Sequence, residues 1–196
     1  MPFISVDIEA SGSIPGVFDM LSLGAVRVQR GAQGYEPTRD ELYLELQPCN
    51  GGIDPQAMRV HGLSLKELKA HGLPPAEAAR RLADWAMRNA TPADPPIFVG
   101  YCANFDWAFV NDMFHRTGVE NPFGYKALDI RALAMGILRL PWLELRQDII
   151  LPLLDLKPLG PDEAHNALAD ARHQAHMLCR LLSRGGMFDA IRLPSE

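Results

Sequence analysis

Three short acidic motifs, far apart in the chain, constrain its fold more than any other feature of the sequence. Asp7-Ile8-Glu9 lies near the amino terminus, Phe105-Asp106 near the middle, and His165 and Asp170 near the end. If these segments meet, four carboxylates share one place, and that much negative charge is unfavourable unless a cation is bound there. The sequence therefore predicts a fold that gathers the three motifs around one metal-binding pocket.

The first motif follows an apolar run, residues 3–9, that we expect to form a buried strand. Side chains alternate between the two faces of a strand, so Asp7 and Glu9 point to the same face and Val6 and Ile8 to the opposite one. Two like charges this close disfavour ionisation, and a divalent cation removes that penalty. Taken alone, the pair is equally consistent with two solvated acids at a strand end.

The other two motifs are expected where helices begin. Residues 97–99 are apolar and typical of a short parallel strand, so Asp106 would start the helix after its carboxyl end, where α/β folds place ligands. His165 and Asp170 are five apart, and on one helix this spacing is about 140° of rotation. We therefore expect His165 in the loop before the last helix, where a histidine suits a general base. Taken alone, each motif is more consistent with ordinary helix-start residues.

The remaining pattern indicates an α/β domain. Further strands are expected at residues 20–29 and 41–47, joined by a turn at Gly31 and Gly34, so that the first three strands form an antiparallel meander. Helices are expected from Ser64, and at about 75–89, 106–116, 129–138 and from Asn166 onward. The interval 140–162 carries several prolines and favours no single long element.

Composition limits the class of protein. A chain of 196 residues with 47% hydrophobic residues has enough apolar surface for one domain, and we expect a single domain over residues 1–196. The net charge of −5 argues against a protein that coats long nucleic acid, so any such contact should be local. Cys49, Cys102 and Cys179 have no zinc-binding spacing and favour a reduced, cytoplasmic protein. We expect no secretory leader and no membrane association.

In this order and spacing the three motifs resemble those of the DEDDh 3'-5' exonucleases, a family of the ribonuclease-H-like superfamily that includes proofreading exonucleases and oligoribonuclease. The matching segments are residues 6–12 (VDIEASG), 99–106 (VGYCANFD) and 165–171 (HNALADA), with a lesser match at 60–63 (VHGL). The resemblance implies a three-layer α/β fold of the ribonuclease-H-like type. In that fold a mixed central sheet, antiparallel in its first three strands and parallel afterwards, is flanked by helices.

The resemblance also implies an activity. It predicts a metal-dependent 3'-5' exonuclease that releases nucleoside 5'-monophosphates from the 3' end of single-stranded or short DNA or RNA. The cofactors would be two divalent cations, Mg2+ or Mn2+, held by Asp7, Glu9, Asp106 and Asp170, with His165 as the general base. The candidate contacts to the terminal nucleotide are Ala10, Ser11, Gly12, His61, Tyr101 and Phe105.

One departure from the family leaves the substrate open. Many relatives carry His-Asn beside the substrate pocket, where this chain has Tyr101-Cys102. Three alternatives to a free-standing exonuclease are a proofreading subunit of a DNA polymerase, a catalytically inactive module that binds nucleic-acid ends, and a metal-dependent phosphatase or phosphodiesterase acting on small molecules. The four acids and the histidine are all present, which favours an active enzyme. Homodimers are common in the family, and the sequence leaves a homodimer open.

Overall fold

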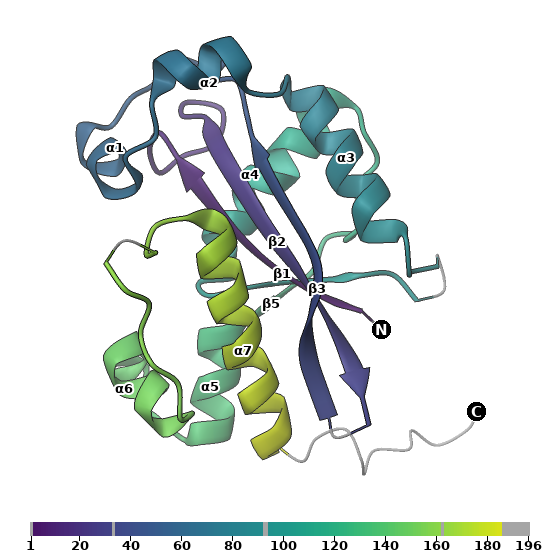
Figure 1. Ribbon diagram of the computed structural model, residues 1–196, viewed down its shortest axis with the longest axis vertical. Coiled ribbons are helices and arrows are strands. Elements are labelled where there is room, and N and C mark those ends of the chain that lie inside the picture. The colour runs from purple at the N-terminus through teal and green to yellow at the C-terminus, as the bar shows by residue number, and fades with distance from the viewer. Residues whose placement is uncertain (1, 33, 92–93, 162, 186–196) are drawn as a thin grey trace.

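A five-stranded mixed sheet forms the centre of the molecule (Figure 1). The computed structural model describes residues 2–32, 34–91, 94–161 and 163–185. The strands are β1 (Phe3–Ala10), β2 (Met20–Gly31), β3 (Gly34–Glu45), β4 (Ile97–Gly100) and β5 (Ala127–Asp129), in the spatial order β3-β2-β1-β4-β5. The first three strands are antiparallel, and β4 and β5 run parallel to β1. The predicted fold class is confirmed.

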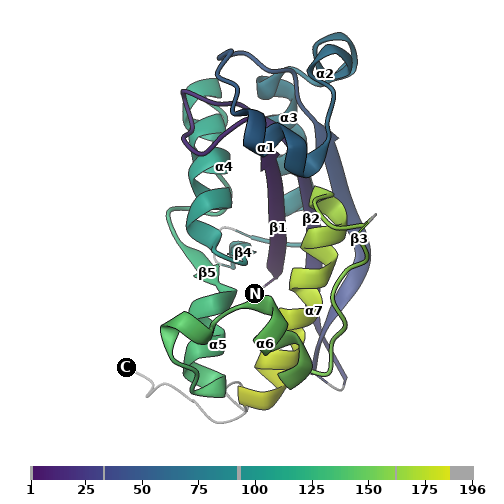
Figure 2. The ribbon, with the colours of Figure 1, turned by 90° about the vertical axis from the view of Figure 1, so that its left-hand side faces the viewer.

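Helices cover both faces of this sheet. They are α1 (Pro55–His61), α2 (Leu65–His71), α3 (Pro75–Met87), α4 (Ala103–Thr117), α5 (Ile130–Leu138), the short 3-10 helix η1 (Trp142–Glu144), α6 (Gln147–Leu153) and α7 (Ala167–Gly185). Figure 2 shows β1 between α4 on one side and α7 on the other. Of the helices that the structure describes, none combines the length and the hydropathy that crossing a bilayer requires.

Two hydrophobic clusters, one on each side of the sheet, divide the side chains of β1 between them. Ile4, Val6 and Ile8 pack in the cluster that contains buried residues of α3 and α4. The opposite cluster contains the buried residues of α5, α6 and α7. Asp7 points to this second side, since its carboxylate contacts Gln174 of α7. The alternation predicted for the acidic strand is therefore the one observed.

Several elements differ from the sequence-based expectation. β3 begins at Gly34 rather than at residue 41, because it follows β2 into the hairpin turn. α4 begins at Ala103, three residues before Asp106. The short strand β5 and the helix α6, which contains Pro152, were not predicted. The beginning of α4 has a tertiary cause, because the Ala103 N–H is capped by the carboxylate of Asp129, which lies 26 positions away.

The amino-terminal end of α7 lies directly on the backbone of β2 at Gly24, the residue that pairs with Asp7. A Cβ atom at Gly24 would overlap the backbone of Ala167 and Leu168. This glycine therefore sets how closely α7 approaches the acidic strand.

Replacing Gly24 with alanine should destabilise the protein by about 1–3 kcal/mol, because the added methyl group forces α7 away from the sheet. Gly136 provides the matched control, since it lies inside α5 with nothing within 4 Å of an added Cβ. Gly136→Ala should stabilise the protein by about 0.5–1 kcal/mol through helix propensity. Urea denaturation of both variants measures the difference. Equal effects of the two changes would show that α7 does not depend on Gly24.

Candidate active site

The carboxylates of the three motifs gather beside the second half of β1. Asp7 lies close enough to Asp106, Asp170 and Glu9 for their charges to raise its pKa. One ligand atom from each of Glu9, His165 and Asp170 lies within 4.8 Å of the others. The fold thus brings the four acids and the histidine, which come from three distant segments, into one place.

Asp106 reaches this place because β4 is short. β4 pairs with β1 only at Phe3, Ile4 and Ser5, so the later part of β1 has no neighbour on that side. The N–H of Ile8 instead donates to Oδ1 of Asp106 at 3.1 Å. The carboxylate thereby replaces a missing strand partner, and its side chain is buried.

Asp170 and His165 are positioned by the beginning of α7. The Asn166 side chain caps this helix, accepting from the N–H of Ala169 at 3.1 Å. Asp170 lies in the first turn, close to the backbone of His165 and Asn166. His165 lies exposed in the loop before the helix with φ of 62°. This is the arrangement that the spacing of the two residues predicts.

The electrostatics of the site oppose four ionised carboxylates. Burial raises the pKa of Asp7 well above its ordinary value, and the charges of Asp106, Asp170 and Glu9 raise it further. Burial, followed by the charges of Asp170 and Asp106, raises the pKa of Glu9 to about 8. Burial also raises the pKa of Asp170. A divalent cation among these oxygens would remove the repulsion, and oxygen donors suit hard cations such as Mg2+ or Mn2+.

Two supporting residues carry no motif signal of their own. Gln174, one helical turn after Asp170, donates from Nε2 to Oδ1 of Asp7 at 2.6 Å and accepts from the N–H of Tyr101 at 3.0 Å. Asp129 accepts from the first helical N–H of α4 and also caps α5. The i, i+4 spacing from Asp170 was the available signal for Gln174, since it predicts that both side chains share a helix face.

A pocket of about 220 Å³ opens beside the carboxylates, past the Glu9 end of the cluster. Six residues that line it are Glu9, Ala10, Gly12, Asp54, His61 and Phe105. Phe105 is 37% exposed, so part of its ring is open to a ligand. Burial lowers the pKa of His61, and its proximity to His165 lowers that pKa further. Four of the six predicted nucleotide contacts therefore border one pocket.

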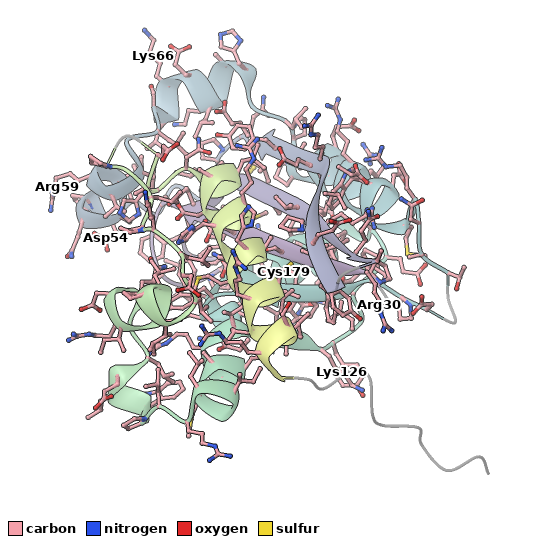
Figure 3. The ribbon with its side chains drawn as sticks, turned by 60° about the horizontal axis from the view of Figure 1, so that its bottom comes forward. Arg30, Asp54, Arg59, Lys66, Lys126 and Cys179 are labelled. Atoms are coloured by element: carbon pink, nitrogen blue, oxygen red, sulfur yellow. The ribbon has the colours of Figure 1, made fainter. Side chains whose placement is uncertain are left out.

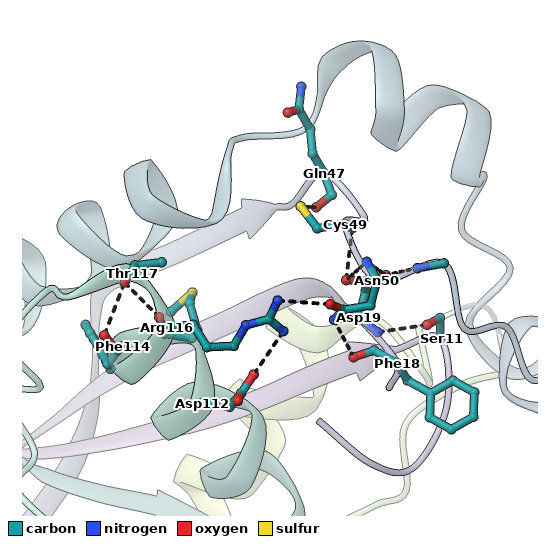
Figure 4. Close-up of polar contacts among 12 residues, drawn as sticks. Ser11, Phe18, Asp19, Gln47, Cys49, Asn50, Asp112, Phe114, Arg116 and Thr117 are labelled. Carbon is teal, nitrogen blue, oxygen red and sulfur yellow. Dashed lines mark hydrogen bonds and ion pairs between the residues drawn. The ribbon is translucent and has the colours of Figure 1, made fainter. Parts of the chain in front are cut away.

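The other two predicted contacts are placed differently. Ser11 is buried, and its hydroxyl donates to the Gly52 carbonyl at 2.7 Å. The same hydroxyl accepts from the Asp19 N–H at 2.9 Å (Figure 4). Tyr101 lies on the Asp7 side of the cluster, away from the pocket, and its hydroxyl donates to the Leu145 carbonyl at 3.1 Å. Gly12 lines the pocket and has no room for a side chain, because the ring of Phe18 fills the space that a Cβ would need.

Comparison with known proteins identifies the family. Residues 3–182 match the family model described as the 3'-5' exoribonuclease Rv2179c-like domain. The chain is 37% identical over 182 residues to an Escherichia coli protein named 3'-5' DNA exonuclease Cap18, covering 93% of this chain and 91% of the relative. It is 27% identical to Ribonuclease T of Baumannia cicadellinicola, covering 92% of this chain and 83% of that one.

The fold agrees with this assignment. The nuclease domain of 3'hExo, described as a DEDDh family member bound to rAMP, superimposes with a TM-score of 0.77 over 94% of this chain and 92% of that chain, at 16% sequence identity. The sequence motifs, the mixed sheet and the family match agree with one another. The chain therefore belongs to the Rv2179c-like 3'-5' exoribonuclease domain family, and it is a 3'-5' exonuclease of the DEDDh type.

Proposed function

We propose that this exonuclease removes single nucleotides from the 3' end of single-stranded or short nucleic acid with two divalent cations, Mg2+ or Mn2+. Asp7, Glu9, Asp106 and Asp170 would hold the cations. The observation that carries this proposal is the meeting of four partly or fully buried carboxylates next to a pocket open to solvent. The burial and mutual repulsion of these groups fit a site built around positive charge.

Each residue of the site has a separate task. When bound, the cations would activate the attacking water and stabilise the departing 3' oxygen. His165 accepts the proton of that water, because its ring lies exposed beside the carboxylates of Glu9 and Asp170. Gln174 keeps the Asp7 carboxylate in one orientation through its hydrogen bond. The product is a nucleoside 5'-monophosphate.

The pocket beside Glu9 would receive the terminal nucleotide. Phe105 presents a partly exposed ring for stacking, and His61 and the backbone of Ala10 and Gly12 line the same space. Ser11 supports this wall from behind, since its hydroxyl and its N–H are bonded to neighbouring backbone. Tyr101 lies on the opposite side of the carboxylate cluster, where its N–H donates to Gln174.

The surface charge supports short or single-stranded substrates. The basic side chains labelled in Figure 3, Arg30, Arg59, Lys66 and Lys126, lie on different elements around the molecule. Relatives named for RNA and for DNA both match this chain, so we propose that the terminal nucleotide is recognised mainly through its phosphate and base stacking.

We further propose one exonuclease domain over residues 1–196, of which 186–196 lie outside the described residues, acting in the cytoplasm as a monomer or a homodimer.

Replacing Asp7 or Asp170 with asparagine should abolish release of nucleotides from labelled single-stranded RNA and DNA, because each change removes a cation ligand. His165→Ala should reduce kcat about 10²–10⁴-fold at neutral pH. The control is Asp148→Asn, which changes an exposed acid that pairs with Arg146. Product analysis by chromatography, with Mg2+, Mn2+ or EDTA, measures the rates. Full activity of Asp170→Asn, or an undiminished rate in excess EDTA, would refute the metal site.

The pH dependence of stability should reveal the buried carboxylates. The folded-state pKa of Glu9, about 8, exceeds the ordinary value of 4.5, so the folded protein holds this proton more tightly than the unfolded chain. The resulting stability is fully present below about pH 4.5 and is lost as the pH rises through 8. In EDTA, the melting temperature should therefore fall by at least about 5 °C between pH 5.5 and 8.5.

Two controls separate this effect from general alkaline destabilisation. Glu9→Gln should flatten the fall, because the amide does not titrate. Adding Mg2+ or Mn2+ should raise the melting temperature more at pH 8.5 than at pH 5.5, because the cation competes with protons for the same oxygens. A wild-type melting curve that does not change with pH in EDTA contradicts the electrostatic account of the site.

Gln174→Leu should weaken cation binding without removing any ligand. The change leaves the Tyr101 N–H without its acceptor and frees the Asp7 carboxylate to rotate, at a cost of about 1–3 kcal/mol in stability. A higher Mg2+ concentration should be needed both for thermal stabilisation and for half-maximal rate. Gln147→Leu, at an exposed position of α6, is the matched control. Identical metal titrations for the two variants would assign Gln174 a purely structural role.

A further inference from the structure

A cationic and aromatic surface borders the active site on the side away from the nucleotide pocket. We call it the shelf, and it consists of Tyr101, Arg131 and Trp142. The Arg131 guanidinium lies 4.8 Å from the ring centroid of Trp142 and 5.9 Å from that of Tyr101. Arg131 also donates to Sγ of Cys102 at 3.1 Å. These contacts hold one cation and two rings in a fixed stack.

Two successive hydrogen bonds connect the shelf to the carboxylate cluster. Its residue Tyr101 donates its N–H to Gln174, and Gln174 donates to Asp7. The nucleotide pocket lies at the other end of the acidic strand, beside Glu9 and Ala10. Figure 2 shows the same order along β1, with α1 at one end and α5 and α6 at the other. The pocket and the shelf therefore lie on opposite sides of the carboxylate cluster.

The chemistry of the shelf fits a single-stranded nucleic acid. Trp142 is 55% exposed, so part of its ring is open to stacking although Arg131 packs against it. Arg131 is half-buried and makes no ion pair with any residue that the structure describes. Its Nε atom is buried without a hydrogen-bond partner there, so contact with a ligand falls to the Nη atoms. An arginine without an ion pair beside a partly exposed indole ring suits a phosphate next to a base, and base stacking on aromatic rings tolerates any sequence.

We propose that the shelf binds the nucleotides that precede the scissile bond. This inference rests on the proposed function, because the 3'-terminal nucleotide in the pocket fixes the direction of the strand. With that nucleotide beside Glu9 and the scissile phosphate at the carboxylates, the strand continues past Asp7 toward Tyr101. Arg131 then pairs with an upstream phosphate, and Trp142 stacks on an upstream base. A dinucleotide is too short to use the shelf fully, and a longer strand gains from it.

The test compares substrate lengths. The ratio of kcat/KM for a single-stranded decamer to kcat/KM for a dinucleotide should exceed one in the wild type. In Trp142→Ala and in Arg131→Gln this ratio should fall about tenfold. Trp142→Phe should retain most of the ratio, because a ring remains. Leu153→Ala, at a 40% exposed position of α6, is the control and should keep the wild-type ratio. Melting temperatures verify that each variant is folded.

Each outcome bears on one proposal. If the wild type releases nucleotides but its ratio does not change in Trp142→Ala and Arg131→Gln, the shelf does not bind the strand. If Trp142→Ala converts a dimer into a monomer in light scattering, the surface is a subunit interface and the inference is overturned. If the wild type releases no nucleotide from any strand, the proposed function fails, whatever the shelf does. A decrease in kcat/KM on the decamer without a matching decrease on the dinucleotide supports the proposed path of the nucleic-acid strand across the shelf.

Discussion

The electrostatic free energy needed to hold four carboxylates together in a partly buried site governs the architecture of this protein. Three different parts of the backbone fix the four acids. Asp7 and Glu9 depend on the alternation of β1, Asp106 takes the N–H that a longer β4 would have used, and Asp170 lies in the first turn of α7. The raised pKa values of the acids show that the folded chain does not neutralise this charge by itself. The proposed cations would supply the positive charge that this arrangement lacks.

The parts of the molecule that we propose bind and cleave the substrate lie along β1. The pocket proposed for the terminal nucleotide, the carboxylates and the shelf follow one another from the end of β1 toward its middle. Gln174 connects the last two, since its amide touches both Asp7 and the backbone of Tyr101. A nucleic-acid strand bound in this order would have its terminal nucleotide in the pocket and its upstream nucleotides on the shelf. Its scissile phosphate would then lie at the proposed cations. Positioning of this kind supplies much of the rate that enzymes gain from binding.

The departure from the family pattern has a structural meaning. Tyr101 and Cys102 stand where many relatives carry His-Asn, and neither reaches the carboxylates directly. Cys102 adopts a left-handed backbone conformation just before α4, and its sulfur accepts from Arg131. The replacement thus leaves the four acids together and forms the beginning of the shelf. Differences in substrate between this chain and its relatives are expected on this side of the site.

The sequence by itself determined the fold class, the shared face of Asp7 and Glu9, and the placing of His165 before its helix, because strand alternation and helix rotation are local geometry. Tertiary structure alone decided the rest. The Ile8 bond to Asp106 joins residues 98 positions apart, and the Gln174 bond to Asp7 spans 167. Gly24 matters only because α7 returns to lie on it. Such contacts depend on how the sheet and the helices pack against each other, and no local pattern in the sequence predicts that packing.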